Sequence, residues 1–108
     1  MVRRQIQVEE TVAHHAADFL AREIAVKALI TVTHADMSPN YKEATIFFSV
    51  LPATMEKDAL KSAKRARSDF RDYLRKNTKL HPTPTVDFEI DFGEKNRQRI
   101  DDLTRKMP

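Results

Sequence analysis

The spacing of hydrophobic and polar residues changes several times along the chain, and each spacing predicts one element. Residues 54–79 carry apolar side chains at helical spacing, while most of their cations fall on the other side of the same helix. The apolar stripe is formed by Ala59, Ala63, Ala66, Phe70, Tyr73 and Leu74. This pattern predicts one long helix that packs on a core and exposes a cationic side.

The stretch before this helix predicts a helix followed by a β-hairpin. Residues 3–24 repeat apolar side chains at helical spacing, whereas residues 28–37 and 44–51 are rich in β-branched and aromatic side chains. Ser38-Pro39-Asn40 separates the two β-rich runs and is typical of a turn. The alternation of the first strand places His34 on its inward face. In the second strand Phe47 and Phe48 are adjacent, so one of them must face away from the helices. Its ring would either pack against neighbouring side chains or stack on a nucleic-acid base.

The last third of the chain predicts one more strand and a short helix. Pro52 ends the second strand, and the Thr54 hydroxyl is a candidate N-cap for the long helix. Residues 86–92 alternate strictly between apolar and acidic side chains, which predicts a half-buried strand with one wet face. Residues 96–106 offer Ile100 and Leu103 as anchors of a short final helix. Helices covering one face of a three-stranded sheet give an α+β two-layer sandwich in the order α-β-β-α-β-α, with the second helix kinked.

Size and composition narrow the function classes. A chain of 108 residues fits a single domain spanning 1–108, and it has no apolar run long enough for a bilayer. The absence of cysteine excludes disulfides and thiolate sites, and a single glycine makes a phosphate-cradling glycine loop untenable. The amino terminus lacks the apolar segment of a secretory signal, so we expect a cytoplasmic protein without a membrane partner.

Charge is concentrated on the predicted long helix. The formal net charge is only +3, but residues 57–79 contain nine Lys or Arg against three Asp. A basic helix side is often no more than a solvated surface, and it is also the usual footprint of a polyanion-binding protein. Charge alone therefore does not distinguish a solvated surface from a polyanion-binding surface, and the rest of the chain must be considered.

Catalytic and metal sites are poorly supported by the sequence. His14 and His15 are adjacent and point apart on a helix, unlike the i, i+4 pair of a zinc-binding helix. Asp87, Glu89 and Asp91 alternate along a strand and are explained by its wet face. No nucleophile and base are brought together by spacing, so we expect a binding protein with no cofactor and no metal.

The ordered set of segments resembles the type II KH domain and, within it, the ribosome-binding factor A family. The matching segments are the basic start of the first helix, the hairpin of residues 30–51, the helix end at residues 68–80, the strand of residues 84–92 and the closing RIDDL. Ordinary KH domains clamp single-stranded nucleic acid with a GXXG loop, which is absent here. The resemblance implies an Ala-x-Gly kink at Ala66-Arg67-Ser68, with serine in the place of glycine.

The resemblance implies a single KH-like RNA-binding domain that associates, as a monomer when free, with immature or free small (30S) ribosomal subunits. It would bind through rRNA and assist rRNA processing and subunit maturation. The expected RNA-contacting residues are Lys57, Lys61, Lys64, Arg65, Arg67, Ser68, Arg71, Arg75, Lys79, Arg3, Arg4 and Lys42. The alternative is a protein-interaction module whose basic helix binds an acidic protein partner.

Overall fold

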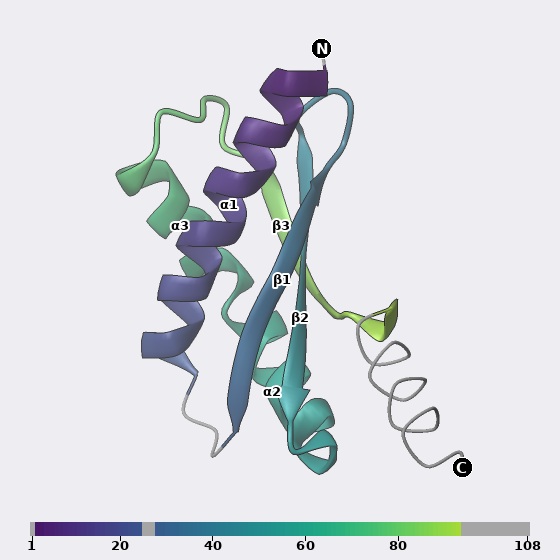
Figure 1. The fold of residues 1–108 in the computed structure, drawn as a ribbon. Coiled ribbons are helices and arrows are strands. Elements are labelled where there is room, and N and C mark those ends of the chain that lie inside the picture. Colours follow the sequence, from purple (N-terminus) through teal and green to yellow (C-terminus); the bar gives the residue numbers. More distant parts are fainter. Residues whose placement is uncertain (1, 25–27, 94–108) are drawn as a thin grey trace, which may run out of the picture.

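A computed structural model describes residues 2–24 and 28–93 of the chain. Its elements follow the predicted order as far as the third strand (Figure 1). They are α1 (Val2–Glu23), β1 (Leu29–Met37), β2 (Glu43–Leu51), a short 3-10 turn η1 (Ala53–Met55), α2 (Glu56–Arg65), α3 (Arg67–Asn77) and β3 (Thr85–Ile90). The predicted last helix, with Ile100 and Leu103, lies outside the described residues.

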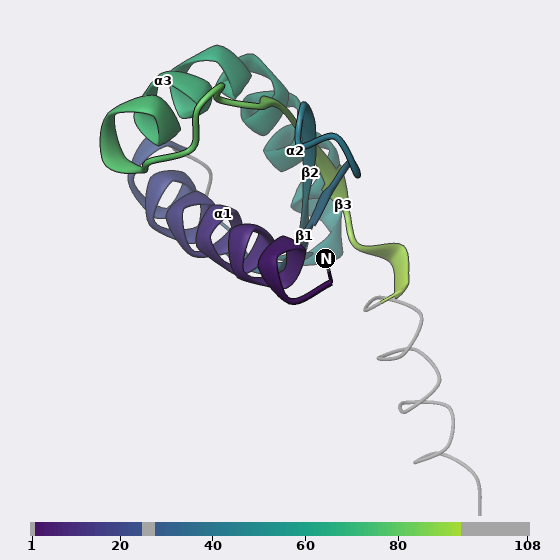
Figure 2. The same ribbon diagram turned by 90° about the horizontal axis from the view of Figure 1, so that it is seen from above.

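The three strands form one mixed sheet whose order is β1-β2-β3. β1 and β2 are an antiparallel hairpin, as predicted, and β3 lies parallel to β2 after a crossover through α2 and α3. Figure 2 shows the helices gathered on one side of the sheet, which leaves its other side without a covering helix among the described residues. The predicted α+β two-layer sandwich is confirmed.

The core lies between the helices and the inward face of the sheet. Phe48 of β2, Phe70 of α3 and Phe88 of β3 are completely buried, and the rings of Phe70 and Phe88 lie 5.6 Å apart. The predicted stripe is confirmed, because Ala59, Ala63, Phe70 and Leu74 are fully buried and Ala66 and Tyr73 are partly buried against the core. Burial of these side chains is what fixes the two helices on the sheet.

The predicted long helix is interrupted at Ala66. This residue leaves the helical region at φ −90° and ψ 5°, and its N–H is shared between the carbonyls of Ser62 and Ala63. The kink therefore lies at Ala66, and Ser68 is an exposed residue in the first turn of α3. The predicted N-cap at Thr54 is wrong, because Thr54 lies inside η1 and no side chain caps η1 or α2.

A β-bulge in β1 reverses the predicted orientation of His34. Val32 pairs with Phe48 and His34 pairs with Phe47, which leaves Thr33 as the extra residue. An extra residue shifts the alternation by one position, so side chains beyond it change face. The predicted inward placement of His34 is therefore wrong. His34 is exposed on the open face, where its ring stacks on Phe47 with centroids 4.6 Å apart.

We predict that Ala63→Leu destabilises the fold by about 1–3 kcal/mol, because a larger side chain at this fully buried position must push α2 away from the sheet. The matched control is Ala21→Leu at an exposed position of α1, which should stay within about 0.5 kcal/mol of the parent. Urea denaturation of the three proteins measures both values. Equal stability of the two variants would contradict the close packing of α2.

Candidate nucleic-acid interface

Three cations of α2 are exposed in a single row. Lys57, Lys61 and Arg65 follow one another at intervals of four residues, so they lie on successive turns of one helix side. Within residues 2–24 and 28–93 no side chain forms an ion pair with any of them. We call these three residues the α2 cations. Their charges face solvent and are available to an anionic ligand.

The cations beside the helix break are held by carboxylates of β3. The Nζ of Lys64 lies 2.9 Å from Asp87 Oδ1 and 3.1 Å from Glu89 Oε1, and Arg67 Nη1 lies 3.2 Å from the same Asp87 oxygen. Arg67 also donates its Nε–H to the Lys64 carbonyl at 3.0 Å, across the break at Ala66. We call Lys64, Arg67, Asp87 and Glu89 the junction cluster. Its carboxylates offset the positive charge that the sequence placed here.

The protonation of the junction cluster follows from these contacts. Partial burial opposes ionisation of Asp87, but hydrogen bonds from Lys64 and from the Phe88 N–H, together with the charges of Lys64 and Arg67, lower the pKa of the Asp87 carboxyl. The hydrogen bond to Asp87 raises the pKa of Lys64, against an opposing effect of burial.

The stabilisation from Asp87 is present above the carboxyl's unfolded pKa and is lost as pH falls through its lowered folded value. The stabilisation from Lys64 is present below the ammonium's unfolded pKa and is lost as pH rises through its raised folded value. Both groups are therefore charged at neutral pH.

Two further arginines of α3, Arg71 and Arg75, also have partners within the protein. Arg71 donates to the carbonyls of Thr83 at 3.0 Å and Pro84 at 3.3 Å, which ties the entry of β3 to the helix. Arg75 pairs with Asp72 one turn earlier, at 3.1 Å. Both side chains are exposed, so they keep part of their attraction for anions.

Three further predicted cations, Arg4, Lys42 and Lys79, lie at the opposite end of the helical layer. Arg4 in α1 and Lys79 after α3 line one hollow, although they are far apart in the sequence. Lys42 is exposed in the β1–β2 turn. The side chain of Arg3 lies outside what the structure describes. Ten of the twelve predicted residues thus divide into the α2 cations, the partly neutralised cations Lys64, Arg67, Arg71 and Arg75, and a separate group of Arg4, Lys42 and Lys79 at the end of the molecule. Ser68 is exposed in the first turn of α3 and belongs to none of these groups.

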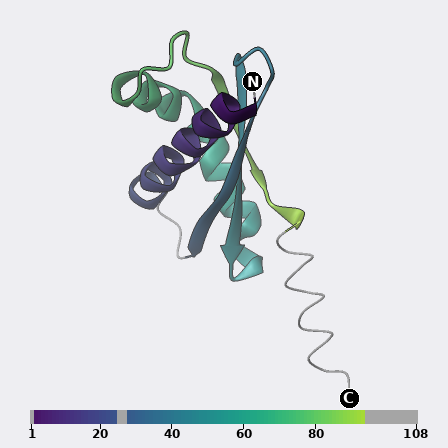
Figure 3. The same cartoon turned by 45° about the horizontal axis from the view of Figure 1, so that its top comes forward.

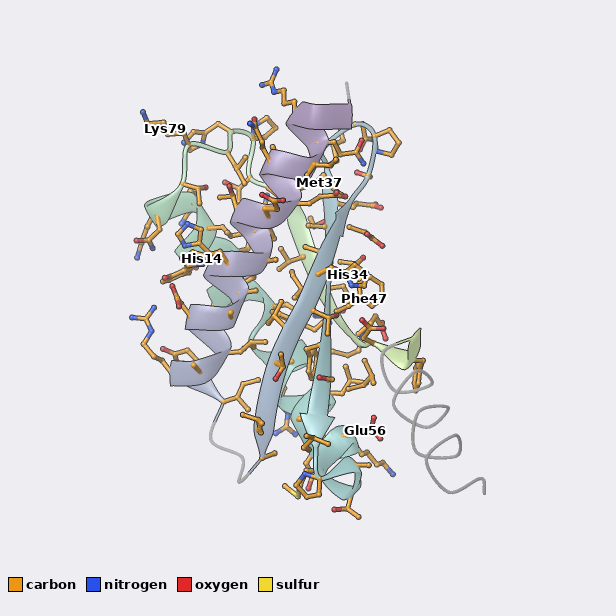
Figure 4. The ribbon with its side chains drawn as sticks, in the orientation of Figure 1. His14, His34, Met37, Phe47, Glu56 and Lys79 are labelled. Carbon is orange, nitrogen blue, oxygen red and sulfur yellow. The ribbon has the colours of Figure 1, made fainter. Side chains whose placement is uncertain are left out.

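The open face of the sheet carries acidic side chains whose contacts with β1 were not predicted from the sequence. Asp91 is buried and accepts from the Thr33 hydroxyl at 2.6 Å, and its Oδ2 lies 3.5 Å from His34 Nδ1. Figure 4 shows His34 and Phe47 together on this side of the sheet. His34 covers the Phe47 ring, and two carboxylates, those of Asp36 and Asp91, lie within 4.0 Å of the His34 ring. Because these carboxylates repel anions, this face is a poor surface for phosphate. The only sequence signal for this arrangement was the acidic alternation in residues 87–91.

The described residues contain neither a metal-binding cluster nor a membrane-spanning helix. Residues 2–24 and 28–93 contain no group of three or more His, Asp or Glu side chains placed to hold a metal ion. None of the helices described here is long and apolar enough to cross a membrane.

Comparison with known proteins identifies the family. Residues 4–104 match the family model described as ribosome-binding factor A. A ribosome-binding factor A from Coxiella burnetii is 29% identical over 108 residues, covering 98% of this chain and 91% of the relative. One from Gemmatimonas aurantiaca is 27% identical over 110 residues, covering 98% and 75%.

The fold agrees with a solved structure of this family. The crystal structure of ribosome-binding factor A from Thermus thermophilus matches with a TM-score of 0.72 and 16% identity, over 80% of this chain and 93% of that one. This second likeness supports the fold, and the family match covers nearly the whole sequence. The chain therefore belongs to the ribosome-binding factor A family.

Proposed function

We propose that this protein binds the ribosome through rRNA, docking on free or immature small subunits and assisting rRNA processing and subunit maturation. The observation that carries the proposal is the row of exposed α2 cations on a chain of this family. The whole chain would act in the cytoplasm as one KH-like RNA-binding domain, and as a monomer when it is free.

The proposed mechanism is binding without covalent chemistry. Each α2 cation that meets a phosphate releases condensed counterions, so the affinity should fall steeply as salt rises. Phosphate contacts position a protein on RNA and carry no sequence information, so the shape of the rRNA would select the site. A domain bound in this way would stabilise one rRNA conformation during maturation.

The junction cluster would moderate this affinity. In this proposal Asp87 and Glu89 reduce the charge that Lys64 and Arg67 present to RNA, next to the Ala66-Arg67-Ser68 segment that takes the place of a KH loop. A lower positive charge weakens binding to every polyanion equally. Shape complementarity would then account for a larger share of the affinity, which suits a factor that must leave a mature subunit.

An acidic protein partner is the competing explanation for the α2 cations. Carboxylates on a protein surface could pair with the same row of side chains. Competition decides between the two: purified small-subunit rRNA should displace a labelled acidic peptide from this protein at low salt. Failure of rRNA to compete, with retention of the acidic peptide, would favour the protein-interaction module.

We predict that the double variant Lys57→Gln/Lys61→Gln lowers the slope of log affinity against log salt for small-subunit rRNA by about 1.4–1.8, because two phosphate contacts are lost. Filter binding across a salt series measures the slope. The matched control is Arg22→Gln/Lys76→Gln, which removes two exposed cations from α1 and α3 and should leave the slope nearly unchanged. An equal decrease of the slope in both double variants would mean that rRNA affinity depends only on the net charge of the protein.

A second prediction concerns the junction cluster. Asp87→Asn/Glu89→Gln removes the partners of Lys64 and Arg67 and should tighten rRNA binding about threefold to tenfold at moderate salt. The same variant should lose no more than about 1 kcal/mol of stability, since these ion pairs are partly exposed. Filter binding and urea denaturation provide the two readouts. Unchanged or weaker rRNA binding by a folded variant would contradict the moderating role.

A further inference from the structure

A hollow of about 290 Å³ lies at the end of the molecule where three segments meet. The start of α1, the β1–β2 turn and the α3–β3 loop converge there, as Figure 3 shows. The apolar part of the lining includes Val8, Met37, Tyr41 and Leu80 together with two prolines of the α3–β3 loop, and Arg4 and Lys79 contribute positive charge. Figure 4 places Lys79 and Met37 at this end. We call this hollow the end cavity.

The aromatic wall of the end cavity depends on an unusual backbone conformation. Tyr41 has φ 59°, and it is the only non-glycine residue with a positive φ in the described ranges. A bulky residue adopts this region only when its surroundings impose it, and such residues concentrate at ligand sites. Here the turn imposes it: the Tyr41 N–H donates to the Ser38 carbonyl, and the Ser38 hydroxyl oxygen accepts from the N–H groups of Lys42 and Glu43.

The other walls are fixed by hydrogen bonds between elements. Gln5 donates its side-chain amide to the Met37 carbonyl at 3.0 Å, and the Met37 N–H donates to Glu9 Oε2 at 2.7 Å. These two bonds set α1, and with it the lining residues of its first turns, against the end of β1. In the α3–β3 loop, the Thr83 hydroxyl donates to the Leu80 carbonyl at 3.1 Å. The cavity is therefore largely preformed, as ligand sites commonly are.

The chemistry of the end cavity fits a flat ring that is linked to negatively charged groups. Its lining combines an aromatic ring and aliphatic side chains with two exposed cations, and it contains no carboxylate. Single-stranded nucleic acids are bound by this combination, because the bases stack on aromatic rings while cations contact the phosphates. Its volume is at the lower end of the range of ligand pockets, about 300–1,000 Å³, so it suits one nucleotide and excludes a duplex.

We propose that the end cavity binds one unpaired nucleotide of RNA, with the base against Tyr41 and the neighbouring phosphates at Arg4 and Lys79. This inference rests on the proposed function, since it assigns a second contact to the same rRNA. The α2 cations would contact phosphates wherever the RNA shape allows, and the end cavity would require a base that is free of pairing. The protein would then prefer RNA with a single-stranded segment beside a helix.

The test compares two RNAs and two variants. The probes are a blunt RNA hairpin and the same hairpin with a short single-stranded extension. Wild-type protein should bind the extended RNA about tenfold more tightly, and Tyr41→Asn should remove this preference because it removes the ring. Asparagine tolerates a positive φ, so this variant should keep the turn, which a thermal melt checks. Tyr41→Phe keeps the stacking ring and should keep the preference.

A second readout follows Tyr41 directly. The chain has two tyrosines and no tryptophan, so Tyr73→Phe leaves Tyr41 as the only strong fluorophore. The extended RNA should quench its emission, and the blunt hairpin should not. The inference would be overturned by unquenched Tyr41 emission, or by a folded Tyr41→Asn variant that prefers the extended RNA as strongly as the wild type does. In that case, salt-dependent binding of both RNAs would still leave the proposed function intact. Absence of binding to either RNA would overturn both. Quenching by an acidic peptide and not by RNA would assign the cavity to a protein ligand.

Discussion

The close packing of α2 and α3 on the sheet is the constraint on which the rest of the structure depends. Ala59 and Ala63 are fully buried and small enough for α2 to approach the sheet closely, whereas the large, fully buried side chains of Phe70 and Leu74 hold α3 on the core. This packing turns the other side of both helices towards solvent and leaves the α2 cations exposed. It also brings Lys64 near enough to the edge strand β3 to meet Asp87.

The fold was largely predictable because each element has a clear period. The apolar stripe of residues 54–79, the two β-rich runs and the strict alternation of residues 86–92 each select one secondary structure, and together they require a two-layer arrangement. Two local features were not predictable from periodicity. The break at Ala66 and the bulge at Thr33 interrupt patterns that continue through them, since alanine is a good helix former and threonine a good strand former, and only the family resemblance indicated a kink at Ala66-Arg67-Ser68. Both breaks change which side chains face outward.

The exposure of the α2 cations was predictable, but the arrangement of the other predicted cations was predictable only in part. Helical spacing alone placed Lys57 and Lys61 on the exposed side of α2. The pairing of Lys64 with Asp87 depends on β3 lying parallel to β2 beneath the helices, which is a property of the topology. The joint position of Arg4 and Lys79 likewise depends on two chain segments meeting at one end. Charges that are distant in sequence therefore decide how much of the predicted cationic surface is available.

The central claim is that α2 contacts rRNA, and lysine footprinting on purified small ribosomal subunits tests it most directly. The protein is acetylated briefly when free and when bound, and modification of each lysine is measured by mass spectrometry. The account predicts that Lys57 and Lys61 are protected in the bound state, whereas the exposed Lys76 on α3 is modified equally in both. Protection of Lys76 together with full modification of Lys57 and Lys61 would contradict the claim.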